Sequence, residues 1–295
     1  MPHDLISIPG QRLAVRAANE QLRGTPVIFI HGITANIDLW EPSLPESIRD
    51  GRRWYSLSLP GHHPAQIDRA TFGSWDAVTP TVWADWYELA LAQLVGDQPV
   101  DVVGWSTGGF TGLTLATHYP QRVRSLLSIS GFAIGLWLGW LGLFQRLSLS
   151  SFTRWGVRTG IRSVGRQRWL FDRLMLSATG DASAYYASAV RERTMQDWFS
   201  AFANHDPVVM SEMFRKIAQF DLADQIGRIA CPTLISAGDA DPYISVSHTR
   251  WIADHVPKAE LVLWPGAGHL FFAERTQAYQ DLLVRWLERQ GLPNG

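Results

Sequence analysis

The stretch "VVGWSTGGFTG", residues 102–112, places Ser106 between Gly104 and Gly108. This G-x-S-x-G spacing is short enough to occur by chance, so its surroundings decide what it means. The apolar run before it, residues 99–105, is typical of a buried strand, and the segment after it has helical character. The serine is therefore predicted to lie on a tight strand-to-helix turn, where the two glycines leave room for an exposed nucleophile.

Strand-like and helix-like segments alternate on both sides of this turn. Short apolar runs bounded by glycine or proline predict strands, and longer segments with helical periodicity predict helices. The predicted strands, of which the first two form a hairpin, cover residues 5–9, 12–18, 26–32, 53–61, 99–105, 123–130, 231–238 and 259–266. The predicted helices cover residues 80–95, 107–120, 245–256 and 275–290. Such alternation predicts an α/β fold with a mostly parallel, doubly wound sheet and helices on both faces.

The alternation stops between residues 131 and 222, where no clear strand occurs. This segment is rich in Trp, Phe, Leu and Arg, and it predicts helices inserted between two halves of one sheet. The predicted organisation is a core of residues 1–130 and 223–295 with a helical lid, or cap, over residues 131–222.

Two further residues are predicted to activate the serine. A serine hydroxyl is a weak nucleophile at neutral pH and needs a base. His269 follows the last predicted strand and a glycine-rich turn, so it should face the same crevice as Ser106. The imidazole needs a carboxylate on its other nitrogen, and Asp239 and Asp241 both follow the strand at 231–238. Asp241 is favoured because it comes after the chain has turned, whereas Asp239 is expected to brace that turn.

Charge that develops on the substrate oxygen requires hydrogen-bond donors. The first predicted donor is the backbone N–H of Thr107, directly after the serine and at a helix N-terminus. The second is the backbone N–H of Ile33, in the loop after the strand at 26–32. We expect His31 to hold this loop in shape rather than to take part in the chemistry.

The order of these residues resembles that of the α/β-hydrolase superfamily, in particular its lid-bearing serine hydrolases. His31-Gly32, the elbow around Ser106, "GDADP" with Asp241 and "GAGH" ending at His269 follow the family order over nearly the whole chain. Members include esterases, thioesterases, lactonases, C–C bond hydrolases, acyltransferases and cofactor-free haloperoxidases. Dehalogenases and epoxide hydrolases of the family use an aspartate nucleophile, so the serine argues against both.

The sequence departs from the family pattern after the strand at 53–61. Ser58 and Pro60 stand where relatives usually carry an aspartate and an arginine, while Gly61-His62 are retained. Because that pair looks like turn scaffolding in relatives, we expect little effect on catalysis.

The predicted function is a serine hydrolase that cleaves a carboxylic ester, thioester or lactone with a lipophilic acyl group through an acyl-enzyme on Ser106. C–C bond hydrolysis, acyl transfer and cofactor-free perhydrolysis by the same three residues are the alternatives. A non-catalytic member that only binds a ligand is a second alternative. No cofactor or metal is implied.

The predicted lid opens with apolar residues, and an arginine series follows. We expect most of the apolar side chains to pack on the core, because large exposed apolar patches are rare; an acyl-binding or membrane-facing surface is the alternative. They are Phe132, Ile134, Leu136, Trp137, Leu138, Trp140, Leu141, Leu143 and Phe144. The arginines are expected to form a solvated face, with an acyl carrier, a coenzyme A thioester or an anionic lipid surface as the alternative partner. They are Arg146, Arg154, Arg158, Arg162, Arg166, Arg168 and Arg173.

The composition limits the partners and the location. The formal net charge is −1 at pH 7, so no global charge favours nucleic acid. The beginning of the chain lacks signal-peptide character and the only cysteine is Cys231, which together fit a cytoplasmic protein. The uncharged run at 131–144 is shorter than the roughly 20 residues that a spanning helix needs. We therefore expect a small acyl substrate and at most a weak membrane-surface contact through the lid.

Overall fold

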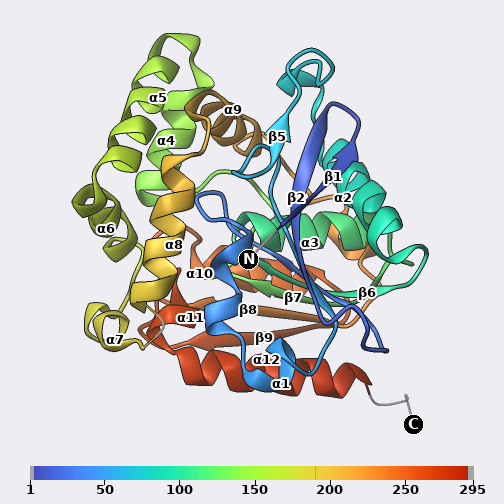
Figure 1. The fold of residues 1–295 in the computed structure, drawn as a ribbon. Helices are drawn as coiled ribbons and strands as arrows, with labels where there is room; N and C mark the ends of the chain where they lie inside the picture. The colour runs from blue at the N-terminus through green and yellow to red at the C-terminus, as the bar shows by residue number, and fades with distance from the viewer. Residues whose placement is uncertain (1–2, 190, 292–295) are drawn as a thin grey trace.

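The strands form one mixed sheet in the computed structural model, which describes residues 3–189 and 191–291 (Figure 1). The main strand order is β1-β2-β4-β3-β6-β7-β8-β9, with β5 paired to β2. β2 runs antiparallel to β1, β4 and β5, and the pairs from β4 to β9 along this order are parallel. The strands are β1 (Asp4–Ile8), β2 (Gln11–Ala18), β3 (Val27–Ile30), β4 (Trp54–Leu57), β5 (Gln66–Ile67), β6 (Val100–Trp105), β7 (Val123–Ile129), β8 (Thr233–Gly238) and β9 (Ala259–Trp264).

Helices cover both faces of the sheet. Figure 1 shows α3 on one face and α1 and α12 on the other, and α2 packs against α3. These helices of the core are α1 (Glu46–Arg49), α2 (Pro80–Val95), α3 (Thr107–His118), α10 (Val246–His255), α11 (Phe271–Glu274) and α12 (Thr276–Gly291). Each predicted strand and helix overlaps an observed one, which confirms the predicted α/β fold class; the short elements β5, α1 and α11 were not predicted.

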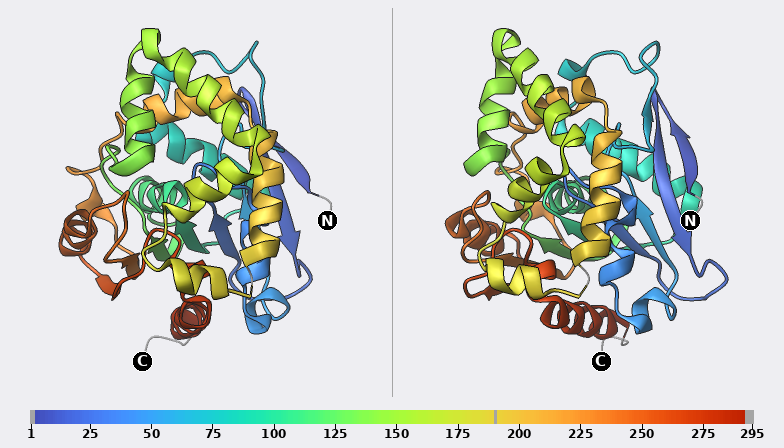
Figure 2. Two further views of the ribbon diagram at one scale, coloured as in Figure 1. Left: turned by 90° about the vertical axis from the view of Figure 1, so that its left-hand side faces the viewer. Right: turned by 60° about the vertical axis from the view of Figure 1, so that its left-hand side comes forward.

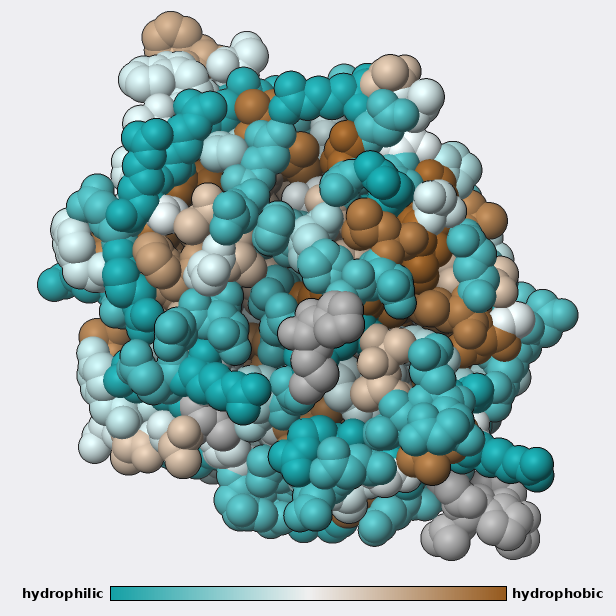
Figure 3. All heavy atoms as spheres, viewed as in Figure 1, coloured by the Kyte–Doolittle hydropathy of each residue, from teal (hydrophilic) through white to brown (hydrophobic). Residues whose placement is uncertain are grey.

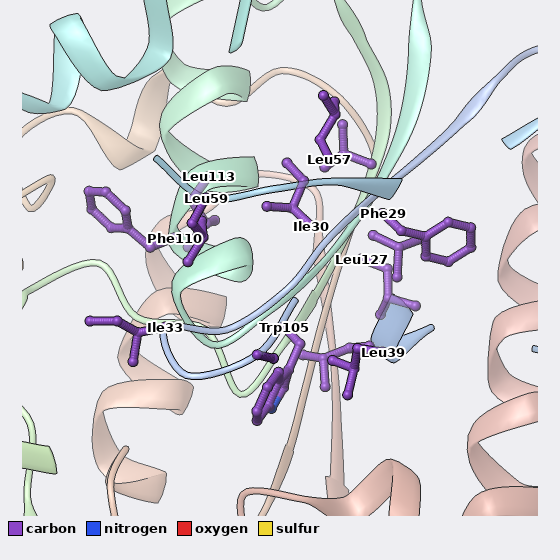
Figure 4. Close-up of a cluster of buried hydrophobic side chains, with 14 of the residues drawn as sticks. Phe29, Ile30, Ile33, Leu39, Leu57, Leu59, Trp105, Phe110, Leu113 and Leu127 are labelled. Atoms are coloured by element: carbon purple, nitrogen blue, oxygen red, sulfur yellow. The ribbon is translucent and has the colours of Figure 1, made fainter. Parts of the chain in front are cut away.

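The centre of the sheet is a buried platform. β3 and β6 are buried along their whole length, as continuous apolar runs covered on both faces should be. Figure 4 shows their side chains packed with those of β7 and α3, among them Phe29, Leu127 and Phe110. The carboxyl ends of β3, β6 and β8 meet at one edge of this platform, because the strands are parallel neighbours or separated only by β7.

Among the described residues, six α-helices are inserted between β7 and β8, and Figures 1 and 2 show them gathered at one end of the sheet. They are α4 (Gly139–Leu149), α5 (Ser151–Arg166), α6 (Arg168–Leu176), α7 (Ala182–Ala187), α8 (Arg191–Ala203) and α9 (Pro207–Ile217). An antiparallel bridge between Ile134 and Asp221 joins the two ends of this insertion. Of the helices within residues 3–189 and 191–291, none has the length and apolar character to cross a bilayer.

The expectation that the insertion's first apolar residues pack on the core is only partly correct. Phe132, Trp137 and Leu141 are buried, and Ile134 and Phe144 are partly buried. The expectation is wrong for Leu136, Leu138, Trp140 and Leu143, which are 40–59% exposed. On the face of the molecule in Figure 3, hydrophobic areas are interrupted by hydrophilic side chains.

The arginine series also divides into groups, and Arg168 forms an ion pair with Asp172 on its own helix at 2.7 Å. Arg154 and Arg158 reach across to α9, where their guanidinium groups lie 2.7 and 3.3 Å from a carboxylate oxygen of Glu212. A solvated face is therefore the wrong description for these two, which join α5 to α9. Arg146, Arg162, Arg166 and Arg173 are exposed and form no ion pair with any residue that the structure describes.

Candidate active site

Ser106 lies on a strained turn between β6 and α3. Its backbone angles are φ 56° and ψ −115°, in a region that residues with a side chain rarely adopt, and its N–H donates to Ile129 O at 2.8 Å. A Cβ atom at Gly104 would lie 2.1 Å from Gly108 O, and one at Gly108 would lie 1.9 Å from Ile30 O. The G-x-S-x-G spacing therefore has a steric cause, because only glycine lets β3, β6 and α3 approach so closely.

His269 and Asp241 form a buried hydrogen-bonded pair. Nδ1 of the imidazole lies 2.7 Å from Oδ2 of the carboxylate. The other carboxylate oxygen accepts the backbone N–H groups of Tyr243 at 2.8 Å and Ile244 at 3.0 Å. These bonds hold the carboxylate in one orientation, and the carboxylate in turn leaves Nε2 of the imidazole free to act as a base.

Asp239 has a different role from its neighbour. It is exposed, and its Oδ1 accepts the backbone N–H of Gly266 at 2.7 Å. Of the two aspartates after β8, Asp241 contacts the imidazole, while Asp239 joins the ends of β8 and β9.

Ser106 and His269 line the same small apolar cavity, of about 20 Å³. No hydrogen bond joins their side chains within the described residues, as is often seen in ligand-free sites. Trp105 holds the loop that carries His269, because its Nε1 donates to His269 O at 3.0 Å. The lining residues are Ile33, Thr34, Trp105, Ser106, Leu141, Leu174, Met175, Ala178, Trp198, Tyr243, His269 and Leu270.

The two predicted oxyanion donors lie at the ends of β3 and β6. Thr107 is the first residue of α3, and Ile33 lies in the loop after β3 and lines the cavity. Their backbone N–H groups donate to no protein acceptor among residues 3–189 and 191–291. Two unpartnered donors beside a serine at a helix N-terminus are suited to binding a negatively charged oxygen.

Three successive carbonyl groups of the loop after β3, residues 33–35, accept hydrogen bonds from side chains. His62 Nε2 donates to the carbonyl of residue 33. Trp198 Nε1 on α8 donates to that of residue 34 at 2.6 Å, and His205 Nε2 after α8 donates to that of residue 35 at 3.1 Å. Two of the three donors belong to the insertion, so the insertion fixes the loop that carries the second predicted oxyanion donor.

A cluster of buried histidines underlies this loop. The ring of His62 lies 5.3 Å from that of His31 and 4.7 Å from that of His205. Burial lowers the pKa of all three, that of His62 to about 4, so the rings are neutral at pH 7. His31 Nε2 accepts the N–H of Leu59 and His205 Nδ1 accepts that of His63, which a protonated ring cannot do. The bonds of His31 match the loop-holding role expected for it.

The insertion also holds the loop that carries the histidine. The N–H of His269 donates to Ala178 O at 2.8 Å. The carboxylate of Glu274 accepts the N–H of Gly268 at 3.0 Å and those of residues 180–181 at 3.1 and 2.7 Å. Burial raises the pKa of this carboxyl, although the N–H donors oppose the shift. Glu274 therefore joins the histidine loop to the turn between α6 and α7.

Sequence reasoning missed Trp198, His205 and Glu274. The first two lie in a helical segment with no motif, and their partners are 164 and 170 residues away in the chain. Glu274 gave a weak signal, because it is a lone acid after the apolar run that follows His269. An acid in an apolar segment close to a predicted base indicates a carboxylate that needs hydrogen-bond partners there.

Ser58, which stands where relatives usually carry an aspartate, forms hydrogen bonds with two neighbouring elements. Its Oγ accepts the N–H of Ala14 at 2.8 Å, and its carbonyl accepts the hydroxyl of Tyr87 at 3.0 Å. The turn after β4 is thus tied to β2 and α2 without a charged pair.

Comparisons with known proteins identify the family and the fold of the chain. The sequence profile of the alpha/beta hydrolase fold family matches residues 25–276. A pimeloyl-[acyl-carrier protein] methyl ester esterase from Neisseria meningitidis is 32% identical, and the alignment covers 89% of this chain and 93% of that protein. Among solved structures, a thermophilic esterase from Thermogutta terrifontis superposes with a TM-score of 0.73 at 19% identity, over 98% of this chain and 99% of that one. An enol-lactonase from Burkholderia xenovorans gives a TM-score of 0.74 at 16% identity, over 97% and 100%.

Proposed function

Because this chain belongs to the alpha/beta hydrolase fold family and is an esterase-like hydrolase, we propose that it cleaves a carboxylic ester, thioester or lactone through an acyl-enzyme on Ser106. The observation that best supports this proposal is the 2.7 Å contact between His269 Nδ1 and Asp241 Oδ2, beside a cavity that Ser106 shares with His269. These are the three parts that serine-based acyl transfer needs.

In the proposed first half-reaction, His269 Nε2 takes the proton of Ser106 as its oxygen attacks the substrate carbonyl. The N–H groups of Ile33 and Thr107 bind the oxyanion of the tetrahedral intermediate. When the intermediate collapses, the protonated imidazole gives its proton to the leaving alcohol or thiol. In the second half, His269 takes a proton from water as the water oxygen attacks the acyl carbonyl. The acyl–serine bond then breaks, the imidazole returns the proton to Ser106, and the carboxylic acid leaves.

We further propose that residues 131–222 form a lid over a core of residues 1–130 and 223–295. The side chains of Leu141, Leu174 and Met175 line the cavity together with core residues, so a substrate in the cavity would lie between the insertion and the sheet. The apolar lining favours a lipophilic acyl group.

The partner of the insertion's outer face is also a proposal. Relatives such as the Neisseria protein are named for an ester of an acyl-carrier protein, and the exposed Arg146, Arg162 and Arg166 are available to a carrier or coenzyme A phosphate. The exposed Phe152 and Trp155 on α5 are suited to a weak contact with a lipid surface.

The proposal is tested with Ser106→Ala. We expect this variant to lose turnover of ester, thioester and lactone panels and to lose labelling by a fluorophosphonate, because no other group supplies the nucleophile. Ser200→Ala, an exposed serine on α8, is the control and should keep both. Turnover that persists in Ser106→Ala would falsify the proposed mechanism.

A further inference from the structure

A second, larger hollow lies on the insertion next to the catalytic cavity. It is a groove of about 370 Å³ between α4, α5 and α6. Its walls are mainly apolar, and two serines and one arginine are set among them. The lining residues are Trp140, Phe144, Gly160, Ser163, Val164, Leu170, Arg173, Leu174 and Ser177.

The groove and the catalytic cavity share a wall made by α4 and α6. On α4, Leu141 lines the cavity while its neighbours Trp140 and Phe144 line the groove. Along α6, Met175 lines the cavity, and Leu174 lines both spaces. Leu174 is therefore the side chain that the groove and the space containing Ser106 have in common.

The inner end of the groove lies on the histidine side of the nucleophile. The groove residue Ser177 has its hydroxyl 3.3 Å from that of Tyr243, whose ring packs edge-on to the imidazole of His269 at 5.2 Å. The next residue, Ala178, accepts the N–H of His269. In ester hydrolysis the leaving oxygen takes its proton from the imidazole, so the alcohol part of a substrate lies on this side.

Arg173 supplies the groove's positive charge. It is exposed, and it makes no ion pair with a residue that the structure describes; the neighbouring carboxylate of Asp172 binds Arg168 instead, at 2.7 Å. A guanidinium at the edge of an apolar groove suits an anionic group at the far end of an aliphatic chain.

We infer that this groove binds the alcohol part of the substrate, a straight aliphatic chain that ends in a carboxylate, sulfate or phosphate held by Arg173. The inference rests on the proposed function and adds its leaving-group specificity. The chain would run from the ester oxygen at His269, past Leu174, into the groove.

The helix α5 offers a matched pair of variants for the test. A Cβ atom at Gly160, in the groove, would meet nothing closer than Phe144 Cζ at 3.9 Å, so a leucine there fills the groove without moving the backbone. Gly156 lies one turn earlier and outside the groove. A Cβ atom added there would have no neighbouring atom within 4 Å. Both substitutions replace a helical glycine by a good helix former, so both variants should fold.

The substrates are ethyl acetate, octyl acetate, the acetate ester of 8-hydroxyoctanoate and ethyl octanoate. We expect Gly160→Leu to lower kcat/KM for both eight-carbon acetates by about tenfold or more, with ethyl acetate and ethyl octanoate changed by less than about twofold. Gly156→Leu should change none of the four. Arg173→Gln should lower kcat/KM for the anionic acetate about fivefold and leave octyl acetate unchanged, whereas Arg250→Gln, at an exposed position on α10, should affect neither.

Two results would overturn the inference: equal losses on short and long alcohols in Gly160→Leu, or a loss confined to ethyl octanoate, which would place the acyl chain in the groove. Calorimetric binding of 8-hydroxyoctanoate to the wild-type chain gives a readout that does not depend on turnover. Binding that Gly160→Leu weakens supports the groove, and an absence of binding at millimolar concentration contradicts it. If no ester is hydrolysed but 8-hydroxyoctanoate binds, the proposed function fails and the groove stands.

Discussion

At the scale of single residues, the site depends on which of two aspartates after β8 contacts His269. Asp239 and Asp241 are two positions apart, yet one is exposed at a turn and the other is buried against the imidazole. The difference arises because β8 ends at Gly238 and the chain must turn before a side chain can project over the sheet edge.

Asparagine at each position tests this assignment. Asp241→Asn should lower kcat by about a thousandfold or more, because the amide cannot hold the imidazole in the productive tautomer. Asp239→Asn keeps an oxygen for the N–H of Gly266 and should stay within about threefold of the wild type. Steady-state kinetics on one activated ester provides the measurement, and equal losses in the two variants would contradict the distinction.

Glu274 is the second residue whose role is decided by its contacts. Its carboxylate accepts three backbone N–H groups, from both the histidine loop and the insertion. In Glu274→Gln one acceptor oxygen becomes an NH₂ group that faces N–H donors, so we expect a loss of about 2 kcal/mol in the free energy of unfolding. Urea titration measures it, with Glu260→Gln as the control, an exposed glutamate on β9 whose loss should cost less than about 0.5 kcal/mol.

At the scale of elements, α8 does more than cover the cavity. Through Trp198 and the following His205, it holds two carbonyl groups of the loop that carries the N–H of Ile33. A donor that must meet an oxyanion within a few tenths of an ångström depends on such support.

Removal of one of these bonds should therefore affect catalysis more than substrate binding. Trp198→Phe keeps most of the ring packing but loses the Nε1–H bond to Thr34 O, and we expect kcat to fall about tenfold while KM changes by less than about twofold. Trp155→Phe, at an exposed position on α5, should have no effect. A change in KM alone would mean that Trp198 only shapes the cavity.

The elements differ in how far sequence predicts them. β3, β6, β8 and α3 were predictable because local apolar runs, glycines and prolines mark their ends, and Ser106, Asp241 and His269 follow from strand ends in a known order. The packing of α4–α9 was not predictable, because helical periodicity gives a buried face but not its partner. Glu212 shows this well: it pairs with Arg154 and Arg158, more than fifty positions away, and turns two expected surface arginines into an interhelical link.

At the scale of the whole molecule, the histidine cluster joins three parts of the chain: the loops after β3 and β4, and the insertion. His31, His62 and His205 are buried and neutral, and two of them accept backbone N–H groups. Charging any of them would place a cation inside this junction, and charging His31 or His205 would also remove an acceptor.

This predicts a molecule that loses stability in mild acid. A histidine whose pKa is lowered by folding binds fewer protons folded than unfolded, so stability falls as pH drops below about 6.5. With a folded pKa of about 4, His62 alone should cost about 2 kcal/mol between about pH 7.5 and about pH 5, and His31 and His205 add losses of the same sign. Urea unfolding at these pH values measures the slope; a flat profile would contradict neutral burial of the cluster.

The bridge between Ile134 and Asp221 has a consequence for how such a chain diversifies. The N–H of Gly135 donates to Phe220 O and that of Leu222 to Ala133 O, so the insertion leaves and rejoins the core at neighbouring points. Because the two ends of the insertion lie side by side, it could be replaced by another set of helices. Such a replacement would need ends a few ångströms apart and would leave β7 and β8 in their present positions. If the insertion is the proposed lid, such an exchange would change part of the cavity lining and leave β6 in place, while the new helices would have to replace the bonds of Trp198 and His205 to the loop after β3.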